Sequence, residues 1–130
     1  MDCIILGDSL AAGVARNHRY CQVHAQPGAG SAVFVSNFKG HARGNVLISL
    51  GANDQPTSDT QRWTDELRSR VSGQVTWILP PNNQRARDAV ANTARRHGDR
   101  ILDIRPFVGH DGIHPNQSGY FRISAMWKPR

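Results

Sequence analysis

Cys3-Ile4-Ile5-Leu6-Gly7-Asp8-Ser9-Leu10, close to the start of the chain, is the stretch that decides the fold. Its four consecutive apolar residues end at a glycine, which is typical of a strand buried on both faces of a parallel sheet. The residues that follow repeat their apolar side chains with helical spacing as far as His18. A buried strand that turns sharply into a helix is the unit from which layered α/β folds are built.

The same alternation of short apolar runs and helix-like segments continues to the end of the chain. We expect four more strands, over Tyr20–Ala25, Asn45–Leu50, Val75–Leu79 and Ile101–Ile104. We expect helices that start near Ser31, that run from a Ser58–Gln61 capping box through Val71, from Asn82 to His97, and from Asn116 to Trp127. Buried strands separated by helices require right-handed crossovers, so the sequence predicts a three-layer α/β/α sandwich with a five-stranded parallel sheet.

The size and composition of the chain fit one domain over residues 1–130. The chain has 130 residues, of which 38% are hydrophobic and 20% charged, an ordinary composition for a globular protein. No apolar stretch approaches the roughly 18 residues needed to cross a bilayer, and no charged leader precedes the first strand. We therefore expect a soluble protein that is cytoplasmic, exported without a cleaved signal, or a mature form whose leader is missing from this sequence.

The balance of charges is basic. The 16 Lys and Arg residues outnumber the 10 Asp and Glu residues, which gives a formal net charge of +6. Such a charge attracts acidic partners at long range, among them anionic glycans, cell-wall polymers, lipid headgroups and nucleic acid. A solvated basic face without a dedicated partner is the other interpretation, and no recognised nucleic-acid-binding motif accompanies the arginines.

The two cysteines, Cys3 and Cys21, are too few for a disulfide framework. Each falls in an expected strand, where we expect a buried free thiol. A single bridge remains open if the two strands are neighbours.

Polar residues directly follow several expected strands, at the rim where parallel α/β sheets bind their ligands. One of them is Ser9, which taken alone is more often a helix cap than a nucleophile. A serine hydroxyl becomes a nucleophile when a base takes its proton and a third group orients that base. Asp111 and His114 can supply both from one loop, because the carboxylate can fold back on the imidazole Nδ1–H and leave Nε2 pointing toward the serine. A local hydrogen bond that stabilises the turn is the alternative interpretation of this pair.

Acyl transfer also needs N–H donors for the oxyanion that develops on the carbonyl group. Asn53, after the third expected strand, could donate from its side chain, and the loop 27–30 could offer a backbone N–H where no side chain blocks approach. The Ser9 N–H, at the start of a helix, is a third donor. Taken singly, Asn53 and the glycines of the loop are ordinary turn residues.

Four segments with these residues occur in a fixed order: Gly7-Asp8-Ser9-Leu10, a glycine in the second loop, Gly51-Ala52-Asn53-Asp54 and Asp111-Gly112-Ile113-His114-Pro115. Together they resemble the four sequence blocks of the SGNH (GDSL) hydrolases, from the first strand to the last helix. The resemblance implies the flavodoxin-like fold of that family.

The resemblance also implies a role for each residue. Ser9 would be the nucleophile and an oxyanion donor, His114 the base, Asp111 its orienting carboxylate and Asn53 a second donor. Gly28 and Gly30 both fit the pattern as the glycine donor, and we prefer Gly28 because hydroxyl or glycine positions and then a helix follow it in the usual arrangement.

No cofactor or metal is expected. His110, Asp111 and His114 could be drawn as metal ligands, but no Cys or further His lies at a suitable spacing. The glycine patterns of dinucleotide-binding and phosphate-binding loops are absent from the sequence.

The short connections after the third and fourth strands point to the substrate. They leave nothing to build a lid or a deep acyl tunnel, which favours a small acyl group such as acetyl on a bulky or polymeric alcohol. The positive charge adds a preference for an acidic glycan or cell-wall polymer. A carbohydrate-binding module that keeps the fold without turnover, and an O-acyltransferase, are the alternatives to an esterase.

Overall fold

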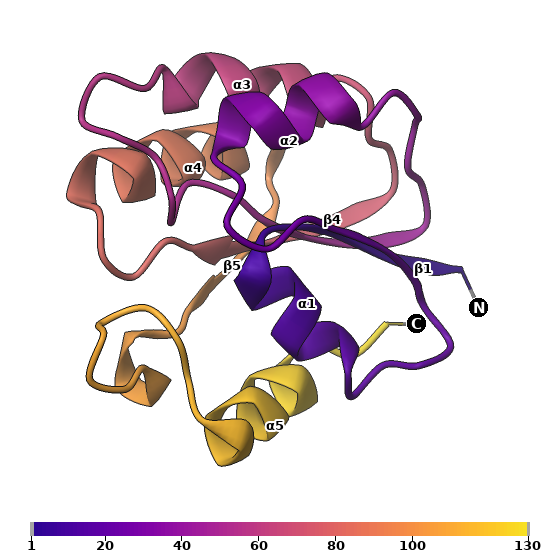
Figure 1. The fold of residues 1–130 in the computed structure, drawn as a ribbon. Helices are drawn as coiled ribbons and strands as arrows, with labels where there is room; N and C mark the ends of the chain where they lie inside the picture. Colours follow the sequence, from indigo (N-terminus) through magenta and orange to yellow (C-terminus); the bar gives the residue numbers. More distant parts are fainter. Residues whose placement is uncertain (1, 130) are drawn as a thin grey trace.

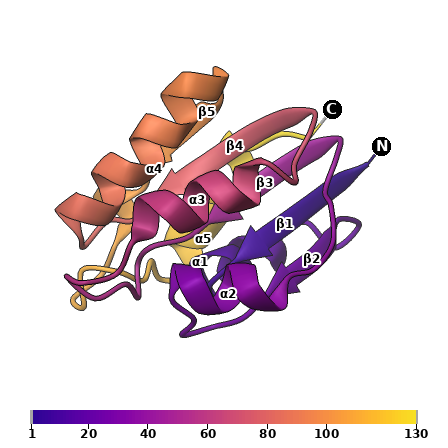
Figure 2. The same cartoon turned by 90° about the horizontal axis from the view of Figure 1, so that it is seen from above.

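The computed structural model describes residues 2–129 and contains the parallel sheet that the sequence predicts. Its strands are β1 (Cys3–Gly7), β2 (Gln22–Ala25), β3 (Asn45–Ser49), β4 (Gln74–Leu79) and β5 (Arg100–Asp103). They lie in the order β2-β1-β3-β4-β5, and all neighbouring pairs are parallel. The predicted five-stranded α/β fold is confirmed, with β2 at one edge of the sheet and β5 at the other (Figure 2).

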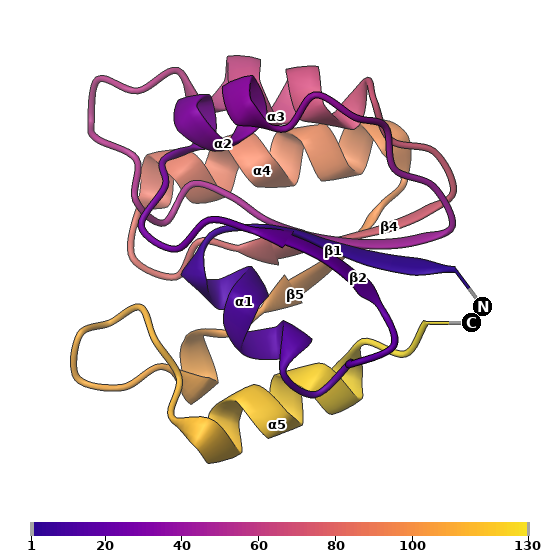
Figure 3. The same ribbon diagram turned by 45° about the vertical axis from the view of Figure 1, so that its right-hand side comes forward.

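Helices cover both faces of the sheet. One face carries α1 (Ser9–Ala15) and α5 (Gln117–Met126), and the other carries α2 (Ser31–Asn37), α3 (Thr60–Arg68) and α4 (Gln84–His97) (Figures 1 and 3). A short 3₁₀ helix, η1 (Arg105–Phe107), follows β5.

Alternate residues of β1 contribute to the two hydrophobic cores. Ile4 and Leu6 belong to the core beneath α2, α3 and α4, whereas Cys3 and Ile5 belong to the core beneath α1 and α5. A strand that is buried on both sides has no polar face, which explains its unbroken apolar run. The longest helix, α4, has 14 residues, and within residues 2–129 no helix has the length and apolar character to span a membrane.

Two helices have their N-cap one residue later in the chain than predicted. The cap of α3 is Asp59 and not Ser58, which belonged to the expected capping box. The cap of α4 is Asn83 and not Asn82, whereas α5 is capped by Asn116 as predicted. Ser, Asp and Asn are similarly good caps, so adjacent residues of these types leave the first residue of a helix open from sequence alone.

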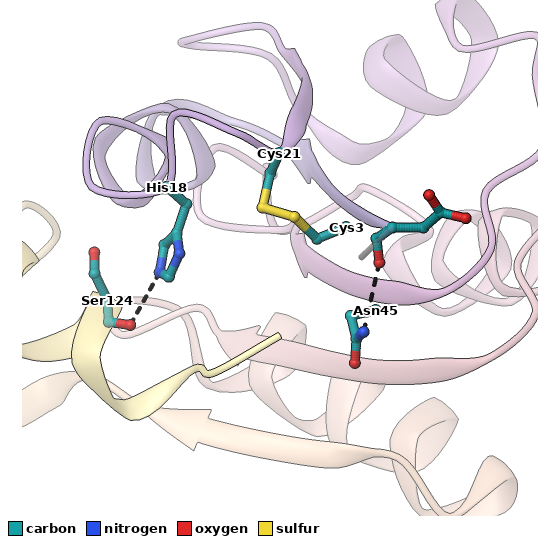
Figure 4. Close-up of a disulfide and its surroundings, with 6 residues drawn as sticks. Cys3, His18, Cys21, Asn45 and Ser124 are labelled. Atoms are coloured by element: carbon teal, nitrogen blue, oxygen red, sulfur yellow. Dashed lines mark hydrogen bonds between the residues drawn. A yellow bond between two sulfur atoms is a disulfide. The ribbon is translucent and has the colours of Figure 1, made fainter. Parts of the chain in front are cut away.

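Cys3 and Cys21 form a disulfide, which corrects the expectation of two buried free thiols. Parallel pairing sets Ile4 of β1 opposite Gln22 of β2, so the cysteines that precede these two residues face each other. Their Cα atoms are 4.8 Å apart (Figure 4), a separation that a disulfide spans. The expectation was wrong because the bond depends on which strand lies beside β1, and no local pattern carries that information.

Candidate active site

The candidate site lies where the sheet reverses its winding. β1 pairs with β2 on one side and with β3 on the other, and ligands of such sheets bind outside the carboxyl ends of strands at this point. Gly7 ends β1 with a φ of +137°, and an added Cβ would lie 2.0 Å from Ser49 O. Glycine permits this close approach, in which the Asp8 N–H donates to Ser49 O over 3.1 Å. The chain then enters α1 with Ser9 as its first residue.

Ser9, His114 and Asp111 form a continuous chain of hydrogen bonds. Ser9 Oγ lies 2.8 Å from His114 Nε2, and His114 Nδ1 lies 2.6 Å from Asp111 Oδ2. The other carboxylate oxygen, Asp111 Oδ1, accepts the backbone N–H groups of Ile113 and His114, each over 2.8 Å. The loop is therefore folded around its own carboxylate, and the contact that the sequence predicts between Asp111 and the imidazole is present.

The charge of Asp111 determines the histidine tautomer. The hydrogen bond from His114, with those from two backbone N–H groups, lowers the pKa of Asp111 to about 2, so this carboxylate is ionised at neutral pH. An ionised carboxylate only accepts, so Nδ1 of His114 carries the proton and Nε2 presents its lone pair to the Ser9 hydroxyl. The side chains of His114 and Asp111 are 44% and 49% exposed, so this part of the site is open to solvent.

Asp8, the residue directly before Ser9, has a buried carboxyl group, which the sequence analysis did not single out. Asp8 Oδ1 accepts the Leu10 N–H over 3.1 Å, which caps α1, and it accepts the Ser49 hydroxyl over 2.8 Å. Burial raises the pKa of Asp8 to about 6, although the two hydrogen bonds lower it in part. In sequence Asp8 is indistinguishable from an ordinary cap, because its burial depends on β3 packing beside β1.

Polar contacts join the loops that follow β2 and β3. Asn53 Nδ2 donates to Ala29 O over 3.2 Å. Asp54 accepts the Ser31 backbone N–H over 2.7 Å and the Ser31 hydroxyl over 2.6 Å, and it accepts the Thr60 hydroxyl over 2.5 Å. Asp54 therefore holds the starts of α2 and α3 together, a function that its place in an expected turn did not reveal.

Gly28 and Gly30 are glycines for different reasons. Gly28 has a φ of +83° in the turn closed by the hydrogen bond from Ala29 N–H to Gln26 O, and its own N–H has no partner among residues 2–129. Gly30 caps α2 with an ordinary φ of −73°, and an added Cβ there would lie 3.1 Å from Asp54 Oδ1. The N–H of Gly30 also has no partner among residues 2–129, but Gly28 lies in an exposed turn, whereas Gly30 is half-buried and makes room for Asp54.

The structure brings three of the predicted site residues into direct contact and puts the others on the neighbouring loops. Ser9 is hydrogen-bonded to His114, and His114 is hydrogen-bonded to Asp111. Within residues 2–129, neither Asn53 nor Gly28 hydrogen-bonds to any of these three. In the same part of the chain, no group of three or more His, Cys, Asp or Glu side chains could hold a metal ion.

Two solved structures share this fold along nearly the whole chain. A carbohydrate acetylesterase from Sinorhizobium meliloti superposes with a TM-score of 0.62 at 12% sequence identity, over 96% of this chain and 95% of that one. A protein of Desulfitobacterium hafniense DCB-2, described as lipolytic and of the G-D-S-L family, superposes with a TM-score of 0.60 at 13% identity, over 97% and 96%. No family model and no curated protein matches the sequence. The chain therefore has the α/β fold of the GDSL (SGNH) hydrolases.

Proposed function

We propose that the protein is a serine esterase that works through a covalent acyl-enzyme. The observation that carries the proposal is the pair of hydrogen bonds from Ser9 Oγ through His114 to Asp111. This geometry activates a serine hydroxyl, because the base lies within reach of the proton and the carboxylate holds the base in the required tautomer. The fold shared with a carbohydrate acetylesterase supports the same class of reaction.

The reaction proceeds in two acyl transfers. His114 Nε2 takes the proton of Ser9 as Oγ bonds to the ester carbonyl carbon, and it then gives that proton to the alcohol as the ester C–O bond breaks. Water, deprotonated by the same nitrogen, attacks the acyl-enzyme. His114 then returns that proton to Ser9 Oγ as the bond between Oγ and the acyl carbon breaks and the carboxylic acid leaves. Asp111 remains ionised throughout and stabilises the imidazolium that forms in each step.

Three N–H donors would stabilise the oxyanion of each tetrahedral intermediate. We assign them to the Ser9 N–H at the start of α1, the Gly28 N–H and the side-chain amide of Asn53. Asn53 donates one amide hydrogen to Ala29 O, which leaves the other for substrate. Neither glycine N–H has a partner among residues 2–129, and Gly28 is preferred because it lies in an exposed turn, whereas the contact with Asp54 already accounts for a glycine at position 30.

An acetyl-type ester on a carbohydrate or cell-wall polymer fits this site best. Both His114 and Asp111 are nearly half exposed, which suits a shallow cleft that admits a bulky alcohol and a short acyl group. The net charge of +6 favours an acidic polymer over a neutral one.

Three experiments test the proposal. Hydrolysis of p-nitrophenyl esters should fall steeply from acetyl to octanoyl, and the opposite trend would contradict a short-acyl site. A fluorophosphonate probe should label the wild type and not Ser9→Ala, since labelling that persists in the variant would remove Ser9 as the nucleophile. Hydrolysis in water without an added acceptor distinguishes an esterase from an acyltransferase and from a binding module that has lost turnover.

A further inference from the structure

A hollow of about 420 Å³ runs along the edge of the sheet beside β2. Its floor contains Gln22 and His24, which pair in register with Ile4 and Leu6 of β1 and so share their face of the sheet. Ile4 and Leu6 are buried beneath the helices, whereas Gln22 and His24 are exposed. The helical layer therefore leaves this part of the sheet face open.

The wall of the hollow comes from the end of α2 and the segment that follows it. Phe38 packs edge-on against His24, with the ring centroids 5.3 Å apart. Lys39 and His41 follow, and both are exposed. Among the described residues that line this hollow none is Asp or Glu, so its charge is positive.

A second hollow, of about 400 Å³, continues the first toward the amino ends of the strands. The two share Gln22 and His41 in their linings, and the second adds Tyr20, which is 67% exposed, and Arg43. Asp2 is the one carboxylate among the described residues that line it. We call the two hollows together the β2 trough.

One end of the β2 trough lies at the carboxyl ends of β1 and β2, on the edge of the sheet that carries the candidate active site. Gln26 lines that end, and its N–H donates to Gly7 O over 2.7 Å. Gly7 is two residues from Ser9, and Gln26 begins the turn that contains Gly28. From residue 22 to residue 26 an extended segment covers about 13 Å. A polymer that lies in the trough therefore reaches the rim on which Ser9 stands.

The side chains along the trough suit a sugar chain that carries negative charge. Asn37 Nδ2 donates to Gln26 Oε1 over 3.2 Å, which orients two amides that can still bind hydroxyl groups. Tyr20 offers an exposed ring face against which the apolar face of a sugar can pack. Lys39 and Arg43 form no ion pair with any described residue, so both cations are available to carboxylate groups of a ligand.

The disulfide between Cys3 and Cys21 links two segments that line or flank the trough. The disulfide between Cys3 and Cys21 ties the start of β1 to the residue that stands between Tyr20 and Gln22 (Figure 4). β2 is an edge strand that pairs with β1 alone. A surface that is rigid before binding loses less conformational entropy when the ligand arrives.

We propose that the β2 trough binds the chain of an anionic polysaccharide and presents an ester of that chain to Ser9. This inference rests on the proposed esterase function and extends it by naming the site that holds the polymer. A nucleic acid fits less well, because single strands bind on a series of large aromatic rings, and Tyr20 is the one strongly exposed Phe, Tyr or Trp among the described residues of the trough.

Binding to polygalacturonate, an unesterified anionic polysaccharide, tests the proposal independently of hydrolysis. Affinity electrophoresis at low ionic strength compares the wild type with Lys39→Glu/Arg43→Glu and with Tyr20→Ala. Both variants should lose about tenfold or more in affinity, because they remove the charge attraction and the packing surface. Hydrolysis of p-nitrophenyl acetate, which is too small to use the trough, should stay at the wild-type rate.

Matched controls separate the trough from the general basic surface. Arg95→Glu/Arg100→Glu makes the same change in charge on α4 and β5, at the opposite edge of the sheet. Phe121→Ala removes a ring on α5 that is 64% exposed, close to the exposure of Tyr20. Both controls should bind polygalacturonate as the wild type does.

Three results would overturn the trough as a polysaccharide site: no binding of polygalacturonate by the wild type, equal losses in the controls, or equally tight trough-dependent binding of a single-stranded oligodeoxynucleotide. A wild type that binds polygalacturonate through the trough and fails to hydrolyse p-nitrophenyl acetate would contradict the esterase proposal and support the binding site. The two proposals can therefore fail separately.

Discussion

Ser49 donates its hydroxyl hydrogen to Asp8 Oδ1 over 2.8 Å and so ties the residue before the candidate nucleophile to the end of β3. Asp8 has no exposed surface, and its Oδ2 has no hydrogen-bond partner among residues 2–129. A charged carboxylate in such a place costs free energy, which is why burial raises its pKa to about 6. The carboxyl group of Asp8, directly before Ser9, therefore takes up a proton at a higher pH than the carboxyl group of an ordinary aspartate does.

Ionisation of Asp8 should make the protein less stable as pH rises. An ordinary aspartate has a pKa of 3.8, whereas that of Asp8 in the fold is about 6, so between these values the folded state keeps a proton that the unfolded chain has released. The stability that this proton provides is complete below the lower value and is lost as pH rises through about 6. The difference corresponds to roughly 3 kcal/mol in the free energy of unfolding between about pH 3 and about pH 8.

Urea unfolding of the wild type and of Asp8→Asn over this range measures the effect. Asp8→Asn should lack that part of the pH dependence, whatever its absolute stability. Asp88→Asn, which changes an exposed carboxyl group on α4, serves as the control and should keep it. A pH dependence that is the same in all three proteins would show that Asp8 does not titrate in this range.

Removal of Ser9 or His114 should abolish nearly all ester hydrolysis. Ser9→Ala and His114→Ala each remove a group that takes part in bond making, so we expect kcat for p-nitrophenyl acetate to fall by about 10⁴-fold or more. Asp111→Ala should cost roughly two orders of magnitude less, because this half-exposed carboxylate can be replaced in part by water at Nδ1. If Asp111→Ala were as inactive as Ser9→Ala, a carboxylate that acts only by orienting His114 and stabilising its imidazolium would be contradicted.

Loss of the Asn53 amide should lower kcat and leave KM nearly unchanged. We expect a fall of about 100-fold or more in Asn53→Ala, because the donor is assigned to charge that develops only in the transition state. Asn82→Ala is the matched control, since Asn82 Nδ2 donates to Ala52 O over 3.0 Å in the adjoining loop and has no assigned role at the oxyanion. Equal losses in the two variants would mean that Asn53 supports the loop and does not bind the oxyanion.

Reduction of the disulfide should destabilise the protein without altering its fold at moderate temperature. For cysteines 18 residues apart, the chain-entropy account gives about 3 kcal/mol. Urea unfolding with and without dithiothreitol should show this loss in the wild type. The variant Cys3→Ser/Cys21→Ser should have the free energy of unfolding of the reduced wild type, and dithiothreitol should not change it. If dithiothreitol left the free energy of unfolding of the wild type unchanged, a stabilising disulfide would be contradicted.

The fold could be predicted from the sequence because its signals are local. An apolar run such as 3–6 that stops at a glycine indicates a buried strand by itself, and helices between such strands leave the parallel sheet as the solution. The contact between Asp111 and His114 was equally accessible, because the two residues share one loop. The contact of Ser9 with His114 spans 105 positions, and it could be expected only because a parallel sheet gathers the carboxyl ends of its strands at one edge.

The features that the sequence analysis missed depend on which segments become neighbours. The bond between Cys3 and Cys21 requires β2 to lie beside β1, and the burial of Asp8 requires β3 on the other side. The role of Asp54 also depends on a distant segment, because Asp54 accepts hydrogen bonds from Ser31, which is 23 positions away in the chain. A polar residue in a turn gives no local sign of such partners.

Asp54→Asn should slow the proposed reaction although, among residues 2–129, Asp54 forms no hydrogen bond with Ser9, His114 or Asp111. The carboxylate accepts three hydrogen bonds, two from Ser31 and one from Thr60. An amide of the same shape presents a donor where one oxygen accepted, so at least one of these bonds is lost, at a cost of about 1–3 kcal/mol. The loops that carry Gly28 and Asn53 would then be held less firmly, and we expect kcat to fall about tenfold with little change in KM.

Asp59→Asn is the control, because it keeps an acceptor at the cap of α3 in the same loop region. Amide hydrogen exchange separates positioning from general destabilisation. If Asp54 positions the oxyanion loops, exchange in the segment 26–31 should quicken in Asp54→Asn while the amides of β1 and β3 keep the protection that global unfolding sets. A variant that is less stable throughout, with kcat unchanged, would assign Asp54 to the stability of the fold alone.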